Sequence, residues 1–431
     1  MIGKSAQEVK ANNSEGKSTL TPNFFTQPNN EDTAMPKTSL AVKKVQITSL
    51  STRLIGSKTH TSVDRKVSAL MSELGEARKA IEQKSKEIGG AAGLPVGDVE
   101  YGVGDGFYRR YQHGIIYFLP PSGPCWVHGA ILAKYRALGA DASLLGYPTT
   151  DELATPDGAG RYTHFERGSI YWTYGTGAHE VHGAIREKWA ALGWEKSWLG
   201  YPKSDELEST EKGYVSVFEK GSIYWWPDTG AIDIGDIAVR YKGLYCFGDT
   251  RAPGDDEPYV IFGVVPTPGA QPSAVRTRIY DGDDSVDAGD SRPDHLELYR
   301  GFPGTVAIGI FLWENDHGNP DHYLGLVKQG ADLAGKGIGQ ACGALFGPEA
   351  GPACEGIWKA VAPEIVGAVN GLLGTGDDLL GTSTWNPTVK YMVTRAGGAC
   401  DNHWGIQYQV QSELLSDGDA SYKVYFDIVR V

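Results

Sequence analysis

The chain has 431 residues, of which 41% are hydrophobic and 22% are charged, so it is long enough for two or three domains with substantial cores. Its formal net charge of −13 and its pI near 5.3 argue against a general nucleic-acid-binding protein, because phosphate binding needs clustered cations. The five cysteines fit no paired zinc-ligand spacing. No apolar run reaches the ~18 residues of a membrane span, and no signal-peptide core follows Met1.

The N-terminal part divides into two segments. Residues 1–40 are rich in Asn, Ser, Thr, Lys and Pro and are expected to form a disordered tail. In residues 41–90, apolar side chains recur at spacings of three and four from Val67 to Ile81, which predicts a long helix over 63–88 that Gly89 and Gly90 end. We expect this helix to pack as a cap on the segment that follows, because it has too few heptads for a stable coiled coil.

The middle of the chain contains a pattern that repeats at a fixed spacing. The sequence Leu-Gly-Tyr-Pro at residues 145–148 returns at 199–202, and His-Gly-Ala-Ile at 128–131 returns at 182–185. A third, more divergent copy lies upstream, with Gly-Leu-Pro at 93–95 and Gly-Ile-Ile-Tyr-Phe at 114–118. A fixed period means that one supersecondary unit is used several times.

Each unit is predicted to contain a short helix, a turn and a β-hairpin. In one copy Ile185, Trp189 and Leu192 form an apolar helical stripe that Gly193 can end, and a histidine precedes the helix. In Leu-Gly-Tyr-Pro, Gly gives the backbone freedom for a turn and Pro fixes φ. Residues 214–218 alternate as a strand does, and 222–226 form the return strand. A single unit of this size buries little, so we expect the copies to pack side by side.

These motifs resemble the LGFP repeat family, named for its Leu-Gly-Phe-Pro turn, with Tyr here in place of Phe. The resemblance covers residues 91–235 and includes Asp-Glu after the turn, Phe-x-x-Gly-Ser-Ile-Tyr-Trp, and the helix that begins with Gly-Ala-Ile. It implies a module of secreted or cell-surface proteins that anchors them to wall polysaccharide, and it does not imply catalysis. Arrays of this family often carry more copies, so either the helix before Gly93 completes this array or its assembly here is truncated.

Aromatic side chains on the repeat strands are candidates for sugar binding. In a strand, alternate residues face opposite sides, so Ile223 and Trp225 share one face, while Tyr224 and Trp226 share the other. One face must be core, and rings on the other could stack on the apolar faces of sugars. We assign Trp172, Trp189 and Trp225 to packing between repeats. The predicted ligand-binding rings are Tyr117, Tyr171, Tyr224 and Trp226.

Residues 236–431 differ in character from the repeats. Short strand candidates separated by Gly, Pro and Asp predict an antiparallel β-sandwich with a helical insertion at about 322–373. The expected strands are 237–245, 259–265, 275–280, 295–299, 305–313, 388–395, 404–412 and 422–429. The fold class is therefore an α+β multidomain protein in which tandem helix-plus-β-hairpin repeats precede the sandwich.

Acidic clusters in this last region suggest a calcium site. Calcium takes six to eight oxygen ligands, and closely spaced Asp residues in loops supply them readily. Residues 313–325 resemble the calcium loop of the calcium- and lipid-binding β-sandwich of protein kinase C type. The alternative is that these Asp and Asn residues form β-turns. The candidate metal ligands are Asp281, Asp283, Glu314, Asp316, Asp321, Asp377 and Asp378.

Three functions follow from this organisation. The first is a noncatalytic extracellular or cell-surface protein that binds cell-envelope polysaccharide through its repeats, with a calcium-binding sandwich. The second is a hydrolase of wall glycan or ester for which the repeats act as a targeting module, although no zincin, Gly-x-Ser-x-Gly or phosphate-loop signature occurs. The third is a calcium-dependent membrane-binding or toxin-like protein that uses the helical insertion.

Overall fold

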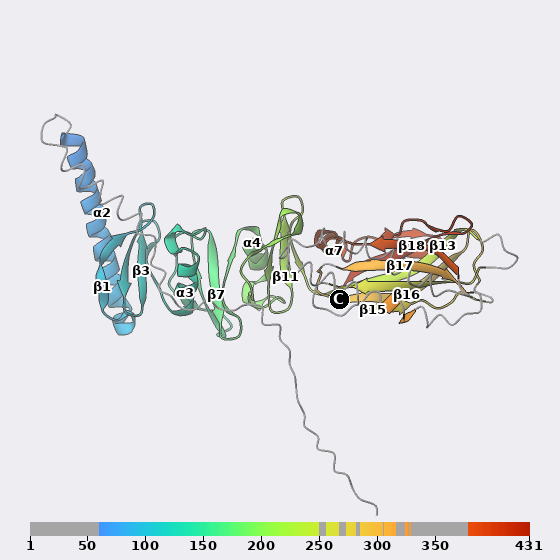
Figure 1. Ribbon diagram of the computed structural model, residues 1–431. Coiled ribbons are helices and arrows are strands. Elements are labelled where there is room, and N and C mark those ends of the chain that lie inside the picture. The colour runs from blue at the N-terminus through green and yellow to red at the C-terminus, as the bar shows by residue number, and fades with distance from the viewer. Residues whose placement is uncertain are drawn as a thin grey trace, which may run out of the picture.

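The repeats and the C-terminal region follow one another along an extended row of sheets (Figure 1). The computed structural model describes residues 60–249, 256–266, 273–281, 285–304, 306–315, 324–325, 327–328 and 378–431. The predicted tail, the N-terminal part of the 41–90 segment and nearly all of the predicted helical insertion lie outside these residues. None of the helices in the described ranges has the length and apolar character needed to cross a membrane.

Three four-stranded antiparallel sheets form the repeat region, and each is a simple meander. Their strand bounds are as follows. Sheet 1 contains β1 (Pro95–Tyr101), β2 (Phe107–Tyr111), β3 (Gly114–Leu119) and β4 (Gly123–Val127); sheet 2 contains β5 (Leu153–Ala154), β6 (Gly160–His164), β7 (Gly168–Thr173) and β8 (Gly177–His182); sheet 3 contains β9 (Leu207–Ser209), β10 (Gly213–Val217), β11 (Ser222–Trp226) and β12 (Gly230–Ile234). The expected hairpins are the central strands of these sheets, so the prediction missed the two outer strands of each.

Helices and sheets alternate along the row. The long helix α2 (His60–Glu87) packs on sheet 1, α3 (Gly129–Ala137) lies between sheets 1 and 2, and α4 (Gly183–Leu192) lies between sheets 2 and 3. Both short helices begin directly after a histidine in extended conformation, as the sequence predicted for His128 and His182. Gly193, at φ +106°, ends α4.

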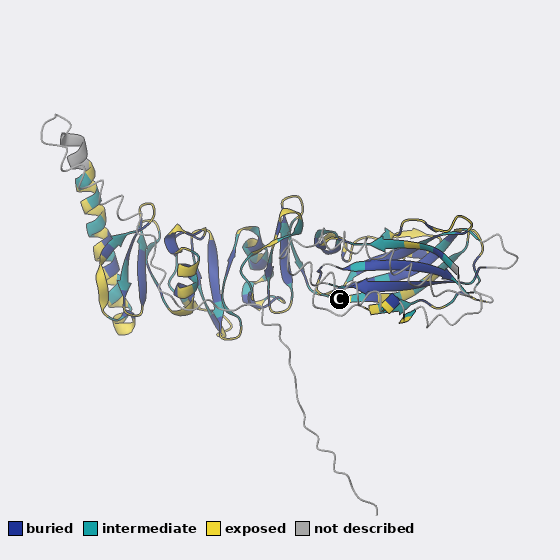
Figure 2. Cartoon of the chain, in the orientation of Figure 1, coloured by how far each residue is buried: buried dark blue, intermediate teal, exposed yellow. Residues whose placement is uncertain are grey.

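Each sheet buries both of its faces, so consecutive residues of one strand belong to different cores (Figure 2). On β7, Ile170 packs in the core that contains α3, whereas its neighbour Tyr171 packs in the core that contains α4. On β3, Ile116 faces α2 and Tyr117 faces α3. The central strands β3 and β7 are therefore buried on both sides.

The Leu-Gly-Tyr-Pro segments connect successive sheets. We call the contacts of residues 145–152 with sheet 1 the first joint. Leu145 is fully buried, Gly146 adopts φ +70°, and the Tyr147 hydroxyl donates to the carbonyl of Val103 (3.0 Å). The ring of Tyr147 lies so close to Gly106 that a Cβ there would be 2.1 Å from Tyr147 Cζ. The tyrosine of one repeat thus fills a hole that glycine leaves in the preceding repeat.

The contacts of residues 199–206 with sheet 2 form the second joint, which has the same design. Gly200 adopts φ +73°, and the Tyr201 hydroxyl donates to Asp157 Oδ1 (2.6 Å) and lies 2.8 Å from Thr155 Oγ1. The ring lies against Gly160, where a Cβ would be 2.8 Å from Tyr201 Cε1. The repeat period in the sequence therefore matches the spacing of this contact between a tyrosine and a glycine of the preceding repeat.

The C-terminal region contains two antiparallel sheets that face each other across one apolar core. The first sheet has the strand order β16-β13-β23-β21, with β22 also paired to β23, and the second has the order β15-β14-β17-β18. The strands are β13 (Ile237–Gly248), β14 (Pro258–Val265), β15 (Ser273–Arg276), β16 (Ser291–Gly301), β17 (Ala307–Glu314), β18 (Asp378–Trp385), β21 (Val410–Gln411), β22 (Leu415–Ser416) and β23 (Ser421–Arg430). A small hairpin of β19 (Asp401–His403) and β20 (Ile406–Tyr408) accompanies them.

One predicted element of this region is wrong, and one strand was not predicted. The segment 388–395 is the helix α7 (Val389–Arg395) and not a strand. The Thr388 side chain accepts a hydrogen bond from the Tyr391 backbone N–H, which caps the helix and favours it over a strand made of the same apolar residues. The strand β18 was missed, because Asp378 and the glycine at 381 indicate a turn when read locally.

Sheet 3 packs against the C-terminal sandwich. Tyr224 and Trp226 belong to the same apolar core as the sandwich strands, and the Tyr224 hydroxyl donates to the carbonyl of Pro303 (3.2 Å). Lys390 of α7 forms an ion pair with Asp228 at 2.8 Å. The face of sheet 3 that has no following repeat is therefore covered by the C-terminal region.

Candidate functional site

The four predicted sugar-binding rings are buried. Tyr117 and Trp226 have no exposed surface, and Tyr171 and Tyr224 are each 3% exposed. The expectation that they face solvent is wrong, because each sheet is covered on both faces. None of these four rings presents a face on which a sugar could stack.

Exposed aromatic surface lies instead beside the second joint. Trp225, assigned to packing from the sequence, is half-buried, and Tyr214 on the neighbouring strand is 36% exposed. These two residues are register partners on β10 and β11, and their ring centroids are 6.0 Å apart.

Both rings line a groove of about 740 Å³ at the second joint. This volume is within the range of ligand-binding pockets. Its wall combines apolar side chains, several carboxylates and the start of α4. The lining residues are Leu138, Leu144, Glu180, His182, Gly183, Ala184, Ile185, Asp205, Glu206, Leu207, Glu208, Tyr214 and Trp225.

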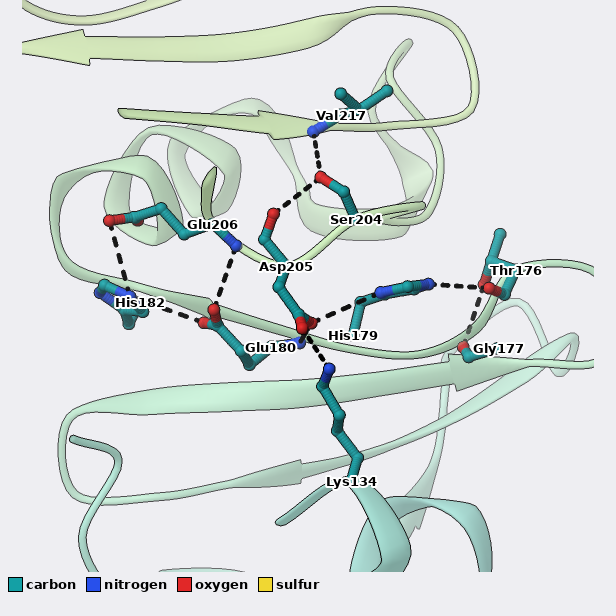
Figure 3. Close-up of polar contacts among 10 residues, drawn as sticks. All are labelled: Lys134, Thr176, Gly177, His179, Glu180, His182, Ser204, Asp205, Glu206 and Val217. Atoms are coloured by element: carbon teal, nitrogen blue, oxygen red, sulfur yellow. Dashed lines mark hydrogen bonds and ion pairs between the residues drawn. The ribbon is translucent and has the colours of Figure 1, made fainter. Parts of the chain in front are cut away.

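Asp205 connects the segment that lines the groove to sheet 2 through hydrogen bonds (Figure 3). Its Oδ1 accepts the backbone N–H of Glu180 (3.2 Å), and its Oδ2 accepts from the ammonium of Lys134. Burial by itself would raise the pKa of Asp205, but His179 and Lys134 together hold this pKa below its usual value. Asp205 is therefore an ionised structural anchor.

Glu180 is the most unusual side chain of the groove. It is 3% exposed; its Oε1 accepts the backbone N–H of Glu206 (3.0 Å), and its Oε2 has no hydrogen-bond partner. Burial raises the pKa of Glu180 to about 7, and the nearby Asp205 adds to this effect. A buried carboxyl group whose pKa is near neutrality is a frequent feature of functional sites.

Glu206 and His182 complete the polar side of the groove (Figure 3). His182 Nε2 lies 3.5 Å from Glu206 Oε1 and 3.7 Å from Glu180 Oε2. Burial raises the pKa of Glu206 as well, and the charge of Glu180 adds to it. One imidazole therefore lies between two carboxyl groups that both resist ionisation.

The structure places the described metal candidates at one end of the second sandwich sheet. Glu314 ends β17 and is the register partner of Pro258 on one side and of Asp378 on the other. Asp281 follows Tyr280, whose backbone N–H donates to the carbonyl of Pro258 (3.1 Å). The remaining candidates, Asp283, Asp316, Asp321 and Asp377, lie outside the described residues. Within the described ranges, no three metal-ligating side chains are grouped together.

The repeats differ from one another at positions that line the groove. When the copies are aligned, Glu180 takes the place of Trp126, and Tyr214 takes the place of Arg161. The paired strands confirm this alignment, because Arg161 is the register partner of Trp172 as Tyr214 is of Trp225. The predicted rings belong to the motif that all copies share, and they are buried. The groove is lined by residues that differ between copies, and these differences could have identified it from the sequence.

Comparison with known proteins supports the interpretation of the repeats. No curated protein matches the chain. The family model of the LGFP repeat matches three consecutive segments, at residues 93–143, 145–197 and 199–245. The boundaries fall directly before Leu145 and Leu199, where each joint begins. The chain therefore carries three tandem LGFP repeats, and the sheets of the first two each receive the tyrosine of the next repeat.

Proposed function

We propose that this protein binds a cell-envelope polysaccharide without cleaving it, and that the groove at the second joint holds a segment of the polymer. LGFP repeats are associated with cell-surface proteins. The observation that carries the proposal is the composition of the groove, in which the exposed surfaces of Tyr214 and Trp225 adjoin Glu206 and Glu208. Sugars offer apolar ring faces and hydroxyl rims, which match aromatic rings beside carboxylates.

The test exchanges single residues between equivalent positions of two repeats. Tyr214→Arg introduces the residue that the preceding repeat has at this position, and it removes one ring from the groove. We expect retention on insoluble wall polysaccharide to fall about tenfold, as the loss of a ring contact of ~1.4 kcal/mol requires. The reverse exchange, Arg161→Tyr, lies outside the groove and serves as the control.

The result is decided by the difference between the two variants. Unchanged retention of Tyr214→Arg, with a melting temperature equal to that of the wild type, would exclude this groove. Equal losses in both variants would point to a general effect on the repeats. Soluble sugars released from the polymer during the assay would favour the hydrolase alternative.

Calcium binding by the C-terminal region is a second proposal. The observation that favours it is the common position of Asp281, Glu314 and Asp378 at one end of a sheet, because calcium takes six to eight oxygen ligands and neighbouring carboxylates supply them. Calcium at a hundred times its dissociation constant should add about 2.7 kcal/mol to stability, seen as a higher melting temperature than in chelator. Asp281→Asn should reduce this difference. Superimposable melts with calcium and with chelator would count against the site.

A further inference from the structure

The two joints have the same backbone but different charges. At the first joint, Asp151 Oδ1 accepts the backbone N–H of Trp126 (2.8 Å) and Oδ2 accepts from Lys84. Asp205 makes the corresponding contacts at the second joint, where the N–H belongs to Glu180 and the ammonium to Lys134. An indole at the first joint is therefore replaced by a buried carboxyl group at the second.

The cation that balances the first joint is absent from the second. Glu152 accepts from Arg161 Nε (3.1 Å) and lies 3.5 Å from His128 Nδ1. Glu206, its equivalent, has His182 at 3.5 Å, but Tyr214 takes the sequence position of the arginine and lines the same groove. The second joint has therefore gained one carboxyl group and lost one guanidinium group.

The remaining cations do not offset this change. Lys134 forms its hydrogen bond with Asp205, and His179 lies beside the same carboxylate at 3.5 Å. The charges of Lys134 and His179 reach Glu180, but neither side chain bonds to it. The His182 ring lies beside both Glu180 and Glu206, at distances too long for a strong hydrogen bond. Two partly or fully buried carboxyl groups that lack a firm cationic partner are costly in the free protein, and a cation placed beside them in the groove would relieve that cost.

We propose that the groove selects a saccharide that carries a protonated amine, so that the ammonium group lies against the carboxyl group of Glu206, near the buried Glu180, while the sugar ring covers Tyr214 and Trp225. This inference rests on the proposed function and names its ligand class. An ammonium group donates up to three hydrogen bonds, and it is also attracted to aromatic faces. A metal ion fits less well, since no three metal-ligating side chains in the described part of the chain are grouped together.

The experiment compares three tetrasaccharides by titration calorimetry with the full chain. These are a glucosamine tetramer, its fully N-acetylated form and cellotetraose, which share a backbone geometry but differ in charge. We expect the glucosamine tetramer to bind about tenfold tighter than the other two, since a hydrogen bond to a charged group contributes ~1.5 kcal/mol. Glu206→Gln should abolish this preference, and Glu152→Gln at the first joint should leave it unchanged.

The outcomes separate this inference from the function on which it rests. If all three tetramers bind equally and Tyr214→Arg weakens them all, the groove binds saccharides but the selection for an amine is wrong. If none binds, the selection for an amine is wrong, and the retention of Tyr214→Arg on insoluble wall polysaccharide decides the proposed function. Cadaverine, an amine without a sugar ring, is titrated as a control ligand. If it binds as tightly as the glucosamine tetramer, the ring contributes nothing and the saccharide assignment is overturned.

Discussion

At the scale of single residues, the groove depends on a glutamate that its surroundings keep partly protonated. Glu180 would have a pKa near 4.5 in the unfolded chain, and burial raises it to about 7 in the fold. Between these values the folded protein binds a proton that the unfolded chain has lost. The contribution of this carboxyl group to the free energy of unfolding is therefore fully present at low pH. It is lost as the pH rises through 7.

Replacing Glu180 by Gln should flatten this pH dependence. Gln keeps the Oε1 acceptor for the backbone N–H of Glu206 but cannot ionise. Relative to Glu180→Gln, the wild type should lose about 3 kcal/mol of unfolding free energy between pH 4.5 and pH 8. Denaturant unfolding at both pH values measures the difference.

The control for this experiment is Glu208→Gln, since Glu208 lines the same groove but is exposed. Its pH profile should follow that of the wild type. His164, whose pKa burial and Arg186 lower to about 4, titrates in all three proteins and cancels in the comparison. Parallel pH profiles of stability for the wild type and Glu180→Gln would contradict the raised pKa of Glu180.

At the scale of elements, the contact between tyrosine and glycine defines the repeat. Tyr147 and Tyr201 fill equivalent holes at Gly106 and Gly160. Sheet 3 has no following repeat to supply such a ring. At its equivalent position, Gly213, a Cβ would lie 2.2 Å from Nε1 of Trp226, so a tryptophan of the same sheet fills the hole. In the last repeat, a side chain of the same sheet therefore takes the place of the tyrosine that a following repeat would supply.

Gly106→Ala should destabilise the first joint. The added methyl would overlap the Tyr147 ring, which is held by hydrogen bonds at its hydroxyl, and overpacking of this kind costs about 1–3 kcal/mol. Chemical denaturation should show the loss. In a Tyr147→Leu background the same substitution should cost much less, since the shorter side chain leaves room.

Gly90→Ala is the matched control, because a Cβ at Gly90 would meet nothing within 4 Å. Its stability should stay within about 0.5 kcal/mol of the wild type. An equal loss for Gly106→Ala in the wild-type and Tyr147→Leu backgrounds would show that the ring is not the obstacle.

At the scale of the whole molecule, the repeats and the sandwich share a core at sheet 3. The rings of Tyr224 and Trp226 are stacked at 5.5 Å, with 3° between their planes, and both pack with the sandwich residues. The groove lies on the other side of the same sheet, where Tyr214 and Trp225 are found. The sandwich therefore holds the strands that carry the groove.

Tyr224→Ala should weaken this connection. Removing a buried aromatic ring costs about 3–5 kcal/mol, and here the loss falls on the contact between sheet 3 and the sandwich. Calorimetry should show a lower melting temperature, with the repeats and the sandwich unfolding in separate transitions. Tyr214→Ala, which removes an exposed ring from the same sheet, should have little effect on the melting temperature. A single unshifted transition for Tyr224→Ala would argue against coupling.

The sequence by itself determined the repeats, because a period of identical motifs needs no knowledge of the packing. It also predicted the short helices with their histidine starts, the central hairpins, and most sandwich strands, since these follow from local periodicity and turn residues. Local patterns could not distinguish the α7 helix from a strand, because its seven residues, Val-Lys-Tyr-Met-Val-Thr-Arg, are compatible with either period.

Only the tertiary structure decided which rings are available to a ligand. Alternation along a strand separates two faces, but it does not reveal whether both faces are covered, and here a helix or a sheet covers each one. Burial, charge balance and the groove at the second joint arise from segments distant in the chain. Lys134, Glu180, Glu206 and Tyr214 meet only because three copies of one unit pack in a row, and that contact is a property of the assembled array.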